Sequence, residues 1–589
     1  MKRPLLVLSL LALSLAIFAQ NADNSKGIEY YKAGLFDFAK TFFQQQTNTD
    51  ANIQSQKYYY LGIIAVEEAS DSAQYYFDKA VLAGQKAPWG YIGKGLLAIQ
   101  AGDAVQVKAQ MKLAEKYGKK DPSALVAIAE AYYAGKDKEN TKKYIDKAKA
   151  RDMKYSGTYI TEGDFALAEE QVGEAQGKYE QAQYFNTADK IATLKIARMY
   201  IKMGRKDLAL EQLNTIFASD PTNIPATIVF GEIKSSEGKY KEAIAAFQKV
   251  MQAGNAPINV YERYAQALYF NKQYNESLAQ INKCIAENPS NIINHRIQAY
   301  NYYEIGQYAD AQKSLEKVME MGSEKTIVYQ DYVTYGLTMT QTAPKQIAGN
   351  AKEDTTNYIE ARQKIMAAFG KAIELKPEVA NTYKEYAYSY YLFFDYANAV
   401  TYYEKFFEMN PDNYLTMDMY TYADASTNYA KQFLAIFSAN KAKMTTEELA
   451  QNKLDFTTYV NKSVEANNKI IAKDTNIYIG YLGRAKANSL QDTYARQETG
   501  SVPGIAKADY EKAIEKMMSQ NAAGNLNSSI VDAYNYLSEY YINQNDVKNT
   551  ILMNQKILEI DPANANADKI LTVLKAPRVA AEPKEAKKK

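Results

Sequence analysis

The chain has 589 residues, of which 47% are apolar and 23% are charged, and this composition excludes a disordered or a membrane-dominated protein. Its 70 Lys and Arg residues against 68 Asp and Glu residues leave a formal charge of +2, too small to indicate nucleic acid or anionic lipid as a partner. Proline (14) and glycine (28) are sparse, which favours long helices over a loop-rich β fold.

The chain begins with MKRPLLVLSLLALSLAIFAQ, which has the organisation of a secretory signal peptide. Lys2 and Arg3 precede an apolar run over residues 5–18, and Ile17-Phe18-Ala19 offers a cleavage site. An uncleaved anchor is the alternative, but the run falls short of the ~20 residues that span a bilayer. We therefore predict a signal peptide over residues 1–19 and an exported protein, periplasmic or associated with the outer membrane.

Cysteine usage restricts this prediction further. The single cysteine is Cys284, so a lipid anchor at the cleavage site and an internal disulfide are both excluded. No later stretch of the sequence is long and apolar enough to span a membrane. The mature chain is expected to gain its stability from packing alone.

A period of 34 residues runs through the first half of the chain. Each period centres on a small residue and carries apolar residues at helical spacing on both sides of a turn such as Gly306-Gln307-Tyr308. Prolines such as Pro221, Pro289 and Pro411 would end the second helix, because proline disfavours helix in the residue before it. The small residues are Gly95, Ala129, Gly163, Ala197, Gly231, Ala265 and Ala299.

This pattern resembles the tetratricopeptide repeat (TPR) family, most closely in residues 199–223 and 388–413. Looser copies centre on Gly27 and Gly62 and, beyond the regular part, near Val333, Ala387, Ala423, Gly483 and Ser538. The resemblance implies an all-α solenoid, a right-handed superhelix of about fourteen helix pairs. The first helix of each pair would then line a concave groove.

We divide the chain into four parts. A regular array over residues 20–323 follows the signal peptide, and an array with stretched helix–helix connections follows over 324–575. The stretched connections are placed at 338–355, 439–448 and 491–504, and a capping helix is placed at 565–575. The Lys-rich tail 576–589 lacks apolar periodicity, which indicates disorder; contact with an anionic envelope surface is the alternative.

No segment carries a pattern typical of an enzyme. His295 and Cys284 both occupy packing positions of the repeat, where a structural role is favoured over a Cys–His catalytic pair. One histidine and one cysteine are too few for a zinc site. The run Gly90-Tyr91-Ile92-Gly93-Lys94-Gly95 lacks the spacing of a phosphate-binding loop, and Trp89 after Pro88 is typical of a helix start. We predict no catalytic residue, no metal and no cofactor.

The groove can be placed by helical geometry. Residues six and three before the small position, and one and four after it, form one stripe on the first helix of a pair. Its mixture of Tyr and Arg with amides is typical of an interface, although the 51 tyrosines of the chain also fit a general preference of its composition. We define the groove stripe by these positions in four repeats. It comprises Ile191, Leu194, Arg198 and Ile201; Asn259, Glu262, Gln266 and Tyr269; Ile293, Arg296, Tyr300 and Tyr303; and Asn381, Lys384, Tyr388 and Tyr391.

Three functions were compared. The resemblance favours a non-enzymatic scaffold of the bacterial cell envelope that binds partner proteins or peptide segments in the groove. A glycan-binding envelope protein would also use exposed aromatic side chains, but the absent lipid anchor counts against it. An accessory subunit of an envelope enzyme or secretion complex is the third. Within the stretch 395–413, Tyr396, Ala399, Tyr403 and Phe406 fit packing positions, whereas Tyr402 and Phe407 remain unassigned.

Overall fold

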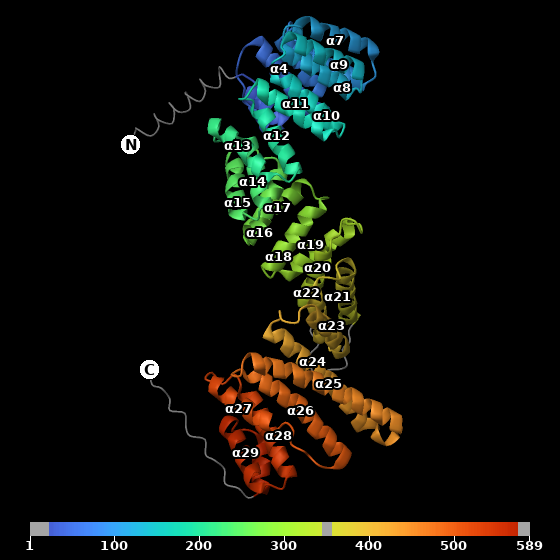
Figure 1. Cartoon of the computed structure of the whole chain (residues 1–589), viewed down its shortest axis with the longest axis vertical. Helices are drawn as coiled ribbons and strands as arrows, with labels where there is room; N and C mark the ends of the chain where they lie inside the picture. Colours follow the sequence, from blue (N-terminus) through green and yellow to red (C-terminus); the bar gives the residue numbers. More distant parts are fainter. Residues whose placement is uncertain (1–22, 344–355, 575–589) are drawn as a thin grey trace, which may run out of the picture. The chain divides into compact units, whose positions relative to one another are not determined.

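The protein is described here by a computed structural model that covers residues 23–343 and 356–574. Within these two ranges there are 29 α-helices, one short 3-10 helix and no β-strand (Figure 1). The all-α fold class predicted from the sequence is therefore confirmed. The signal peptide predicted over 1–19 and the Lys-rich tail 576–589 lie outside the described residues.

The helices fall into two compact units, and each is described by itself. Unit 1 is Met1–Gly306 and unit 2 is Gln307–Lys589. The helices of unit 1 are α2 (Ser25–Lys32), α3 (Phe36–Gln45), α4 (Ala51–Glu67), α5 (Ala73–Ala83), α6 (Trp89–Gln100), α7 (Ala104–Gly118), α8 (Pro122–Ala134), α9 (Lys138–Arg151), α10 (Ser156–Ala168), α11 (Val172–Phe185), α12 (Lys190–Lys202), α13 (Lys206–Ser219), α14 (Ile224–Ser236), α15 (Tyr240–Gln252), α16 (Ile258–Phe270), α17 (Tyr274–Glu287) and α18 (Ile292–Glu304).

Successive helices of unit 1 pack as antiparallel pairs, α2 with α3, α4 with α5 and onward to α16 with α17. One residue with a left-handed backbone marks the turn inside each pair, and from Gly102 onward it recurs at the 34-residue period. Glycine takes this conformation without strain at Gly204 (φ 75°), whereas Lys272 takes it with a side chain (φ 63°). The repeat seen in the sequence is thus a repeat of backbone geometry.

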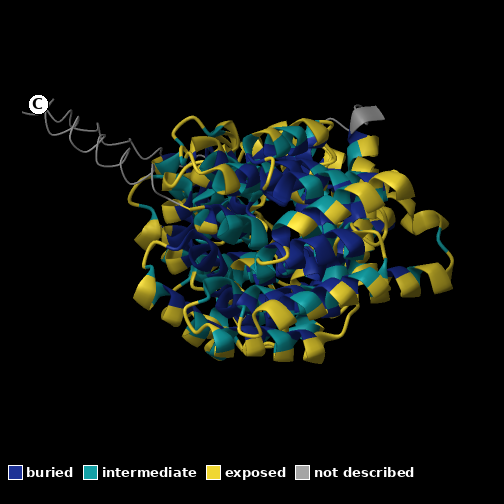
Figure 2. Cartoon of the chain, turned by 90° about the horizontal axis from the view of Figure 1, so that it is seen from above, coloured by how far each residue is buried: buried dark blue, intermediate teal, exposed yellow. Residues whose placement is uncertain are grey.

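The small residue of each period lies where the two helices of a pair approach closely. A Cβ added at Gly163 would lie 2.4 Å from Tyr179 of α11, and one at Gly231 would lie 2.8 Å from Phe247 of α15. A large aromatic side chain of the second helix therefore fills the space that the missing side chain leaves. Figure 2 shows the result: buried residues lie on the faces that meet other helices, and exposed residues lie on outer faces and in turns.

Unit 2 continues with helix pairs but varies their length. Its helices are α19 (Tyr308–Met321), α20 (Tyr329–Thr342), α21 (Thr356–Leu375), α22 (Ala380–Leu392), α23 (Tyr396–Met409), α24 (Thr416–Asn440), the 3-10 helix η1 (Lys441–Lys443), α25 (Thr446–Lys473), α26 (Tyr478–Thr499), α27 (Lys507–Gln520), α28 (Asn527–Asn543), α29 (Val547–Ile560) and α30 (Ala565–Val573). The pairs are α20–α21, α22–α23, α24–α25, α26–α27 and α28–α29. The last helix, α30, packs against α29.

Two details of the predicted second half are wrong. The small position of α20 is Gly336 and not Val333, because a Cβ at Gly336 would lie 2.7 Å from Phe369 of α21. The residues predicted as stretched connections at 439–448 and 491–504 mostly belong to helices, since α24, α25 and α26 reach 25, 28 and 22 residues. Part of the third connection, 344–355, lies outside the described residues.

The added turns of α24, α25 and α26 stay helical because they bury a core of their own, which we call the extension core. Tyr494 of α26 stacks on Phe437 of α24 and on Phe456 of α25, with ring centroids 4.2 and 4.6 Å apart. All three rings are buried. The extension core consists of Ala430, Leu434, Phe437, Phe456, Val460, Ala487, Leu490 and Tyr494.

The aromatic stretch of α23 is mostly framework. Tyr403 and Phe406 are 1% and 2% exposed, as their packing positions predict. Tyr402, which the sequence left open, stacks on Tyr390 of α22 with ring centroids 5.5 Å apart. Phe407 packs against the core formed by α24 and α25, so neither side chain is a free surface aromatic.

Candidate binding groove

The stripe positions of four first helices in unit 1 meet in space. Stripe residues of α4, α8, α10 and α12 line a single cavity of ≈390 Å³. They therefore share one side of these helices, as the spacing requires. Counted from the small residues Gly62, Ala129, Gly163 and Ala197 by the same rule, the stripe positions in its wall are Gln56, Ser123, Val126, Glu130, Gly157, Ile160 and Ile191.

The chain's own first helix lies on this side. Ile28 and Lys32 of α2 line the same cavity. Lys32 Nζ lies 2.5 Å from Oε1 of Glu130, the stripe residue of α8, and Thr161 of α10 donates a hydrogen bond to that oxygen at 2.8 Å. Burial lowers the pKa of Lys32, but the Glu130 carboxylate together with Tyr60, Tyr31 and Asp164 outweighs burial, and the pKa is raised above its usual range. Here α2 lies where a partner's segment would bind.

An ion pair and a hydrogen bond also join α2 to the turn between α13 and α14. Lys26 Nζ and Lys190 Nζ lie 3.4 and 2.9 Å from Oδ2 of Asp220, and Asn223 donates to Glu29 Oε1 at 2.6 Å. Burial alone would raise the pKa of Asp220; hydrogen bonds from Lys190 and Asn223 and the charge of Lys26 hold it well below its usual range.

Apolar contacts complete this closure of the first pair on the seventh pair, α14–α15. Leu35 and Phe38, at the start of α3, are 5% and 6% exposed. They belong to one buried cluster with Ile228 of α14 and Phe247 of α15. The closure joins residues about 200 positions apart in the chain and covers part of the predicted groove.

This closure corrects one predicted site residue. Leu194 is only 4% exposed and belongs to the cluster of Ala197, Leu213 and Val229, against which Ala33 of the first pair packs. Leu194 is therefore a core residue and not an exposed groove residue. Ile201 packs against the same cluster from its edge.

Beyond the closed part, the charged stripe residues Arg198 of α12 and Glu232 of α14 lie next to Arg263 of α16, which is off the stripe. Arg198 Nη1 lies 3.8 Å from Oε2 of Glu232, and Arg263 forms an ion pair with the other oxygen of the same carboxylate. Burial lowers the pKa of Arg198; burial and the neighbouring charge of Arg198 lower that of Arg263. Two guanidinium groups thus share one carboxylate.

A pocket of ≈320 Å³ lies next to this cluster, between α14–α15 and α16. Its apolar wall includes the stacked rings of Tyr240 and Phe270, whose centroids are 5.2 Å apart. Its polar wall is formed by Glu232, Ser235, Ser236, Arg263 and Gln266. Among the described residues the buried hydroxyl oxygen of Ser235 has no hydrogen-bond partner. The pocket combines an apolar side with the Arg263–Glu232 ion pair and this hydroxyl.

The stripe continues with partly buried aromatic residues on α16 and α18. The rings of Tyr269 and Tyr300 are 6.2 Å apart. Burial, together with Glu304 and Tyr274, raises the pKa of Tyr269 to about 12. Further along α18, Arg296 and Tyr303 are also half-buried, and Ile293 is exposed.

Glu262 of the stripe has a structural role. Its Oε1 accepts hydrogen bonds from Asn291 and Asn294, at 2.8 and 2.9 Å. The carboxylate thereby ties α16 to the start of α18 and is not available to a partner without breaking these bonds.

Unit 2 holds the remaining predicted groove residues on α22. Tyr388 is 39% exposed, and its ring stacks on Tyr391 at 6.3 Å. Tyr391 donates a hydrogen bond to Asp424 of α24 at 2.8 Å; burial and this carboxylate raise its pKa above the usual range. Lys384 lies 3.4 Å from the carboxylate of its neighbour Glu385. Only Tyr388 of this set presents a largely open aromatic ring.

One of these helix pairs, α22–α23, matches a family model. The Tetratricopeptide repeat family model matches residues 380–413, which are these two helices and the turn that follows them. Over these residues the chain is similar to a tetratricopeptide repeat (TPR). TPR repeats generally serve protein–protein interaction, and proteins built from them are typically non-enzymatic scaffolds.

Several solved structures are similar to parts of this chain. The C-terminal part of a TPR repeat-containing protein from Cytophaga hutchinsonii is 22% identical over 53% of this chain and 99% of that chain, with a TM-score of 0.38. pilF from Pseudomonas aeruginosa is 16% identical over 40% of this chain and 96% of that chain, with a TM-score of 0.33. YrrB, a TPR protein with an unusual peptide-binding site, is 18% identical over 34% of this chain and 92% of that chain, with a TM-score of 0.27. At these TM-scores the likenesses carry no argument about this chain. The comparison with curated proteins gives no match.

The two residues considered for catalysis are packed into the framework. Nε2 of His295 lies 2.9 Å from the carbonyl oxygen of Pro289, and the residue is 9% exposed. Cys284 is fully buried. Burial is the main cause that raises the pKa of its thiol to about 12, and the charges of Glu262 and Glu287 add to it. A thiol with this pKa stays protonated and unreactive at neutral pH.

The glycines before and within α6 serve helix packing. A Cβ at Gly93 would lie 2.0 Å from Phe77, and one at Gly90 would lie 2.5 Å from the backbone of Val81. Trp89, the first residue of α6, is 1% exposed and donates from its indole nitrogen to Asn52 at 3.1 Å. These contacts leave the run without the open backbone that a phosphate site requires.

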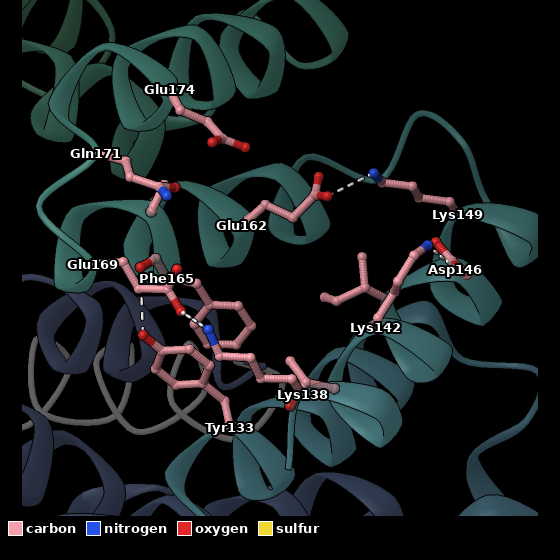
Figure 3. A pocket seen from close by; sticks show the side chains of 13 residues that line it. Tyr133, Lys138, Lys142, Asp146, Lys149, Glu162, Phe165, Glu169, Gln171 and Glu174 are labelled. Atoms are coloured by element: carbon pink, nitrogen blue, oxygen red, sulfur yellow. Dashed lines mark hydrogen bonds and ion pairs between the residues drawn. The ribbon is translucent and has the colours of Figure 1, made fainter. Parts of the chain in front are cut away.

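Another surface pocket, of ≈410 Å³, is lined by several ion pairs (Figure 3). Lys149 reaches Glu162 at 2.7 Å, and Lys142 reaches Asp146 at 2.7 Å, as the dashed lines in Figure 3 mark. Lys138 pairs with Glu169 at 3.2 Å. Because each of these cations has a carboxylate partner, the pocket offers no unpaired cation to an acidic ligand.

Two searches of the described ranges gave no further site. Residues 23–343 and 356–574 contain no group of three or more His, Cys, Asp or Glu side chains that could hold a metal ion. No helix in the same ranges combines the length and the apolar character needed to cross a membrane.

Three residues of the groove, Glu232, Arg263 and Lys32, were not predicted from the sequence. Glu232 occupies the stripe position directly after Gly231, so applying the stripe rule to that repeat would have found it. Arg263 lies two residues before Ala265, off the stripe, and no sequence signal shows that its side chain reaches Glu232. Lys32 was missed because the first pair was expected to be an ordinary repeat.

Proposed function

We propose that this protein is a non-enzymatic TPR scaffold of the bacterial cell envelope that binds protein or peptide segments along the groove stripe. The observation that carries the proposal is the row of Arg198, Glu232, Gln266, Tyr269 and Tyr300 on successive first helices of unit 1. Large aromatic and Arg side chains that are half-buried in a monomer can anchor a partner at low entropic cost.

Export is part of this proposal and rests on the sequence of residues 1–19 alone. Fusing that segment to alkaline phosphatase, which is active only after export to an oxidising compartment, tests it directly. Reporter activity equal to that of a leaderless fusion would contradict export and leave the binding proposal untouched.

The binding proposal is tested by affinity capture from an envelope fraction with quantitative mass spectrometry. The full chain is compared with Tyr269→Ala plus Tyr300→Ala, and with the control Tyr184→Ala, whose ring is 80% exposed on a second helix. We expect a reproducible partner that the double variant loses and the control retains. A partner kept at full yield by the double variant would show that the stripe of unit 1 is not the binding surface.

A matching variant separates the two units. Tyr388→Ala removes the open aromatic ring of α22 and leaves unit 1 unchanged. If this variant alone loses the partner, binding belongs to unit 2.

A further inference from the structure

The charge of the Arg198, Glu232 and Arg263 cluster is unbalanced. Each arginine pairs with Glu232, and within the described residues no other carboxylate forms an ion pair with either of them. Two guanidinium groups therefore share the single carboxylate of Glu232. The other groove-side carboxylate of α16, Glu262, is hydrogen-bonded to Asn291 and Asn294. Both guanidinium groups are partly withdrawn from water, with 39% and 40% of their side chains exposed.

Partial burial makes this imbalance consequential. Burial lowers the pKa of both arginines, and the charge of Arg198 lowers that of Arg263 further. A charged group that has lost part of its hydration gains more from a new partner of opposite charge than a fully hydrated group does. One more carboxylate would bring the cluster to two charges of each sign.

The adjacent pocket adds a second requirement. Its apolar side is formed by Tyr240, Phe270 and the buried ring of Phe247, and Phe270 is 56% exposed. Arg263 and its partner Glu232 belong to both the charged cluster and the pocket wall. A ligand that reaches Arg263 with a charged group thus places its next residue beside an apolar cavity of ≈320 Å³, large enough for one side chain.

We infer that this part of the groove binds a partner segment in which an Asp or Glu lies next to a large apolar residue. The carboxylate bridges Arg198 and Arg263, and the apolar side chain enters the pocket between Tyr240 and Phe270. The inference rests on the proposed function and narrows it to an acidic partner segment. A basic segment is disfavoured, because its cations would meet the unbalanced guanidinium charge.

The cluster itself indicates which variants discriminate. Arg198→Gln and Arg263→Gln each remove one positive charge and weaken binding of an acidic segment. Glu232→Gln removes the internal carboxylate that competes with the ligand, so it strengthens that binding. A purely structural role of the cluster predicts weaker binding for all three variants, so the opposite sign for Glu232→Gln is the diagnostic result.

The experiment uses the full chain and synthetic 12-residue peptides with a central Asp-Leu or Glu-Leu in a Gly/Ser background. Peptides with Asn-Leu, Gln-Leu and Asp-Ser at the same place are the matched ligands. Saturation-transfer NMR, which detects weak binding, gives the dissociation constants. We expect the acidic peptides to bind about tenfold more tightly than their amide counterparts, since one desolvated charge contact is worth about that factor.

The preference for acidic over amide peptides, expressed as the ratio of their dissociation constants, should fall at least severalfold in Arg198→Gln and in Arg263→Gln. It should persist in the control Arg205→Gln, whose side chain is 57% exposed and pairs with Asp207. Glu232→Gln should tighten acidic peptides and leave amide peptides unchanged. Circular dichroism melts of each variant verify that it is folded.

Two results would overturn the inference. Equal binding of acidic and amide peptides, or no binding of either, would show that the cluster does not select a carboxylate. Loss of the preference in Arg205→Gln, with retention in Arg263→Gln, would place the selective site elsewhere. The capture experiment with Tyr269→Ala plus Tyr300→Ala judges the proposed function separately, because it does not depend on partner charge.

Discussion

Unit 1 and unit 2 bury the apolar faces of their helix pairs in different ways. Unit 1 keeps helices of 13 or 14 residues from α12 to α17, and its first pair turns back onto the seventh. Unit 2 instead lengthens three consecutive helices, whose added turns form the extension core. A single repeat cannot bury its own apolar face. The two units show that either a distant repeat or extra helical turns can provide the missing cover.

The largest expected effect comes from breaking the extension core of unit 2. Phe437→Ala removes a buried ring that stacks on Tyr494, and we expect a loss of about 3–5 kcal/mol in the free energy of unfolding. The lone tryptophan, Trp89, lies in unit 1. Urea titration followed by circular dichroism should therefore show a destabilised phase, while the fluorescence of Trp89 keeps its midpoint.

Leu454→Ala is the control for this prediction, because Leu454 is 61% exposed on α25. It should change stability by less than about 0.5 kcal/mol. If Phe437→Ala lowered the urea midpoint read by Trp89 fluorescence, the two units would not unfold separately, and the prediction would be contradicted.

The second effect tests the closure of unit 1. Leu35→Ala opens a cavity between the first and seventh pairs, and we expect it to cost about 2–4 kcal/mol. Hydrogen exchange measured by mass spectrometry should speed up in α2, α3 and α14. Exchange unchanged in α14 would show that the first pair does not support the seventh; Val105→Ala, at a side chain that is 76% exposed, is the control.

A smaller effect concerns the ionic part of the same closure. Because the pKa of Asp220 is depressed in the folded state, its ionised form stabilises the fold above the unfolded pKa of about 3.9. This contribution is lost as the pH falls through the lower, folded pKa. Asp220→Asn should therefore cost about 1–2 kcal/mol at pH 7 and progressively less in acid.

Urea titrations of wild type and Asp220→Asn between pH 7 and pH 3, read by Trp89 fluorescence, measure this difference. Asp146→Asn, at an exposed intrahelical pair on α9, is the control and should show a small difference. If the difference in unfolding free energy between wild type and Asp220→Asn stayed constant across the pH range, the hydrogen-bond geometry of Asp220, and not its charge, would be the stabilising factor.

The smallest effect distinguishes regular from strained turns within unit 1. Lys272 has a left-handed backbone, so Lys272→Gly should stabilise unit 1 by up to about 1 kcal/mol, whereas Gly204→Ala should destabilise it by a similar amount. Thermal melts followed by Trp89 fluorescence compare the two. Equal shifts of the same sign would show that backbone strain at these turns is negligible.

Much of the fold could be predicted from the sequence, because its signals are local. Gly163 and Tyr179 are 16 residues apart, and their close contact recurs in repeat after repeat. The lengths of α24 to α26 could not be predicted from the same period. Their added turns carry apolar residues such as Phe437 and Tyr494 that lie in different helices, and only the packed structure shows that they share one core.

The candidate groove was predicted in part. The stripe rule places Arg198, Gln266 and Tyr269 on one side of their helices, because it depends only on helical geometry. It failed at Leu194, which is buried beside Ala33 of a repeat far away in the sequence. It also gave no sign that Glu262 is occupied by two asparagines of the next repeat.

The sequence by itself determined that the chain forms helix pairs, where each pair turns, and which side of each first helix faces the groove. These features depend on residues within one repeat of each other. Only the tertiary structure decided which part of that groove is covered, since Lys32 meets Glu130 across 98 positions and Asn223 meets Glu29 across 194. Such contacts depend on the rotation that accumulates from repeat to repeat. The total rotation cannot be predicted from any single repeat. It brings the first pair onto the seventh, and it places Arg198, Glu232 and Arg263 in one cluster.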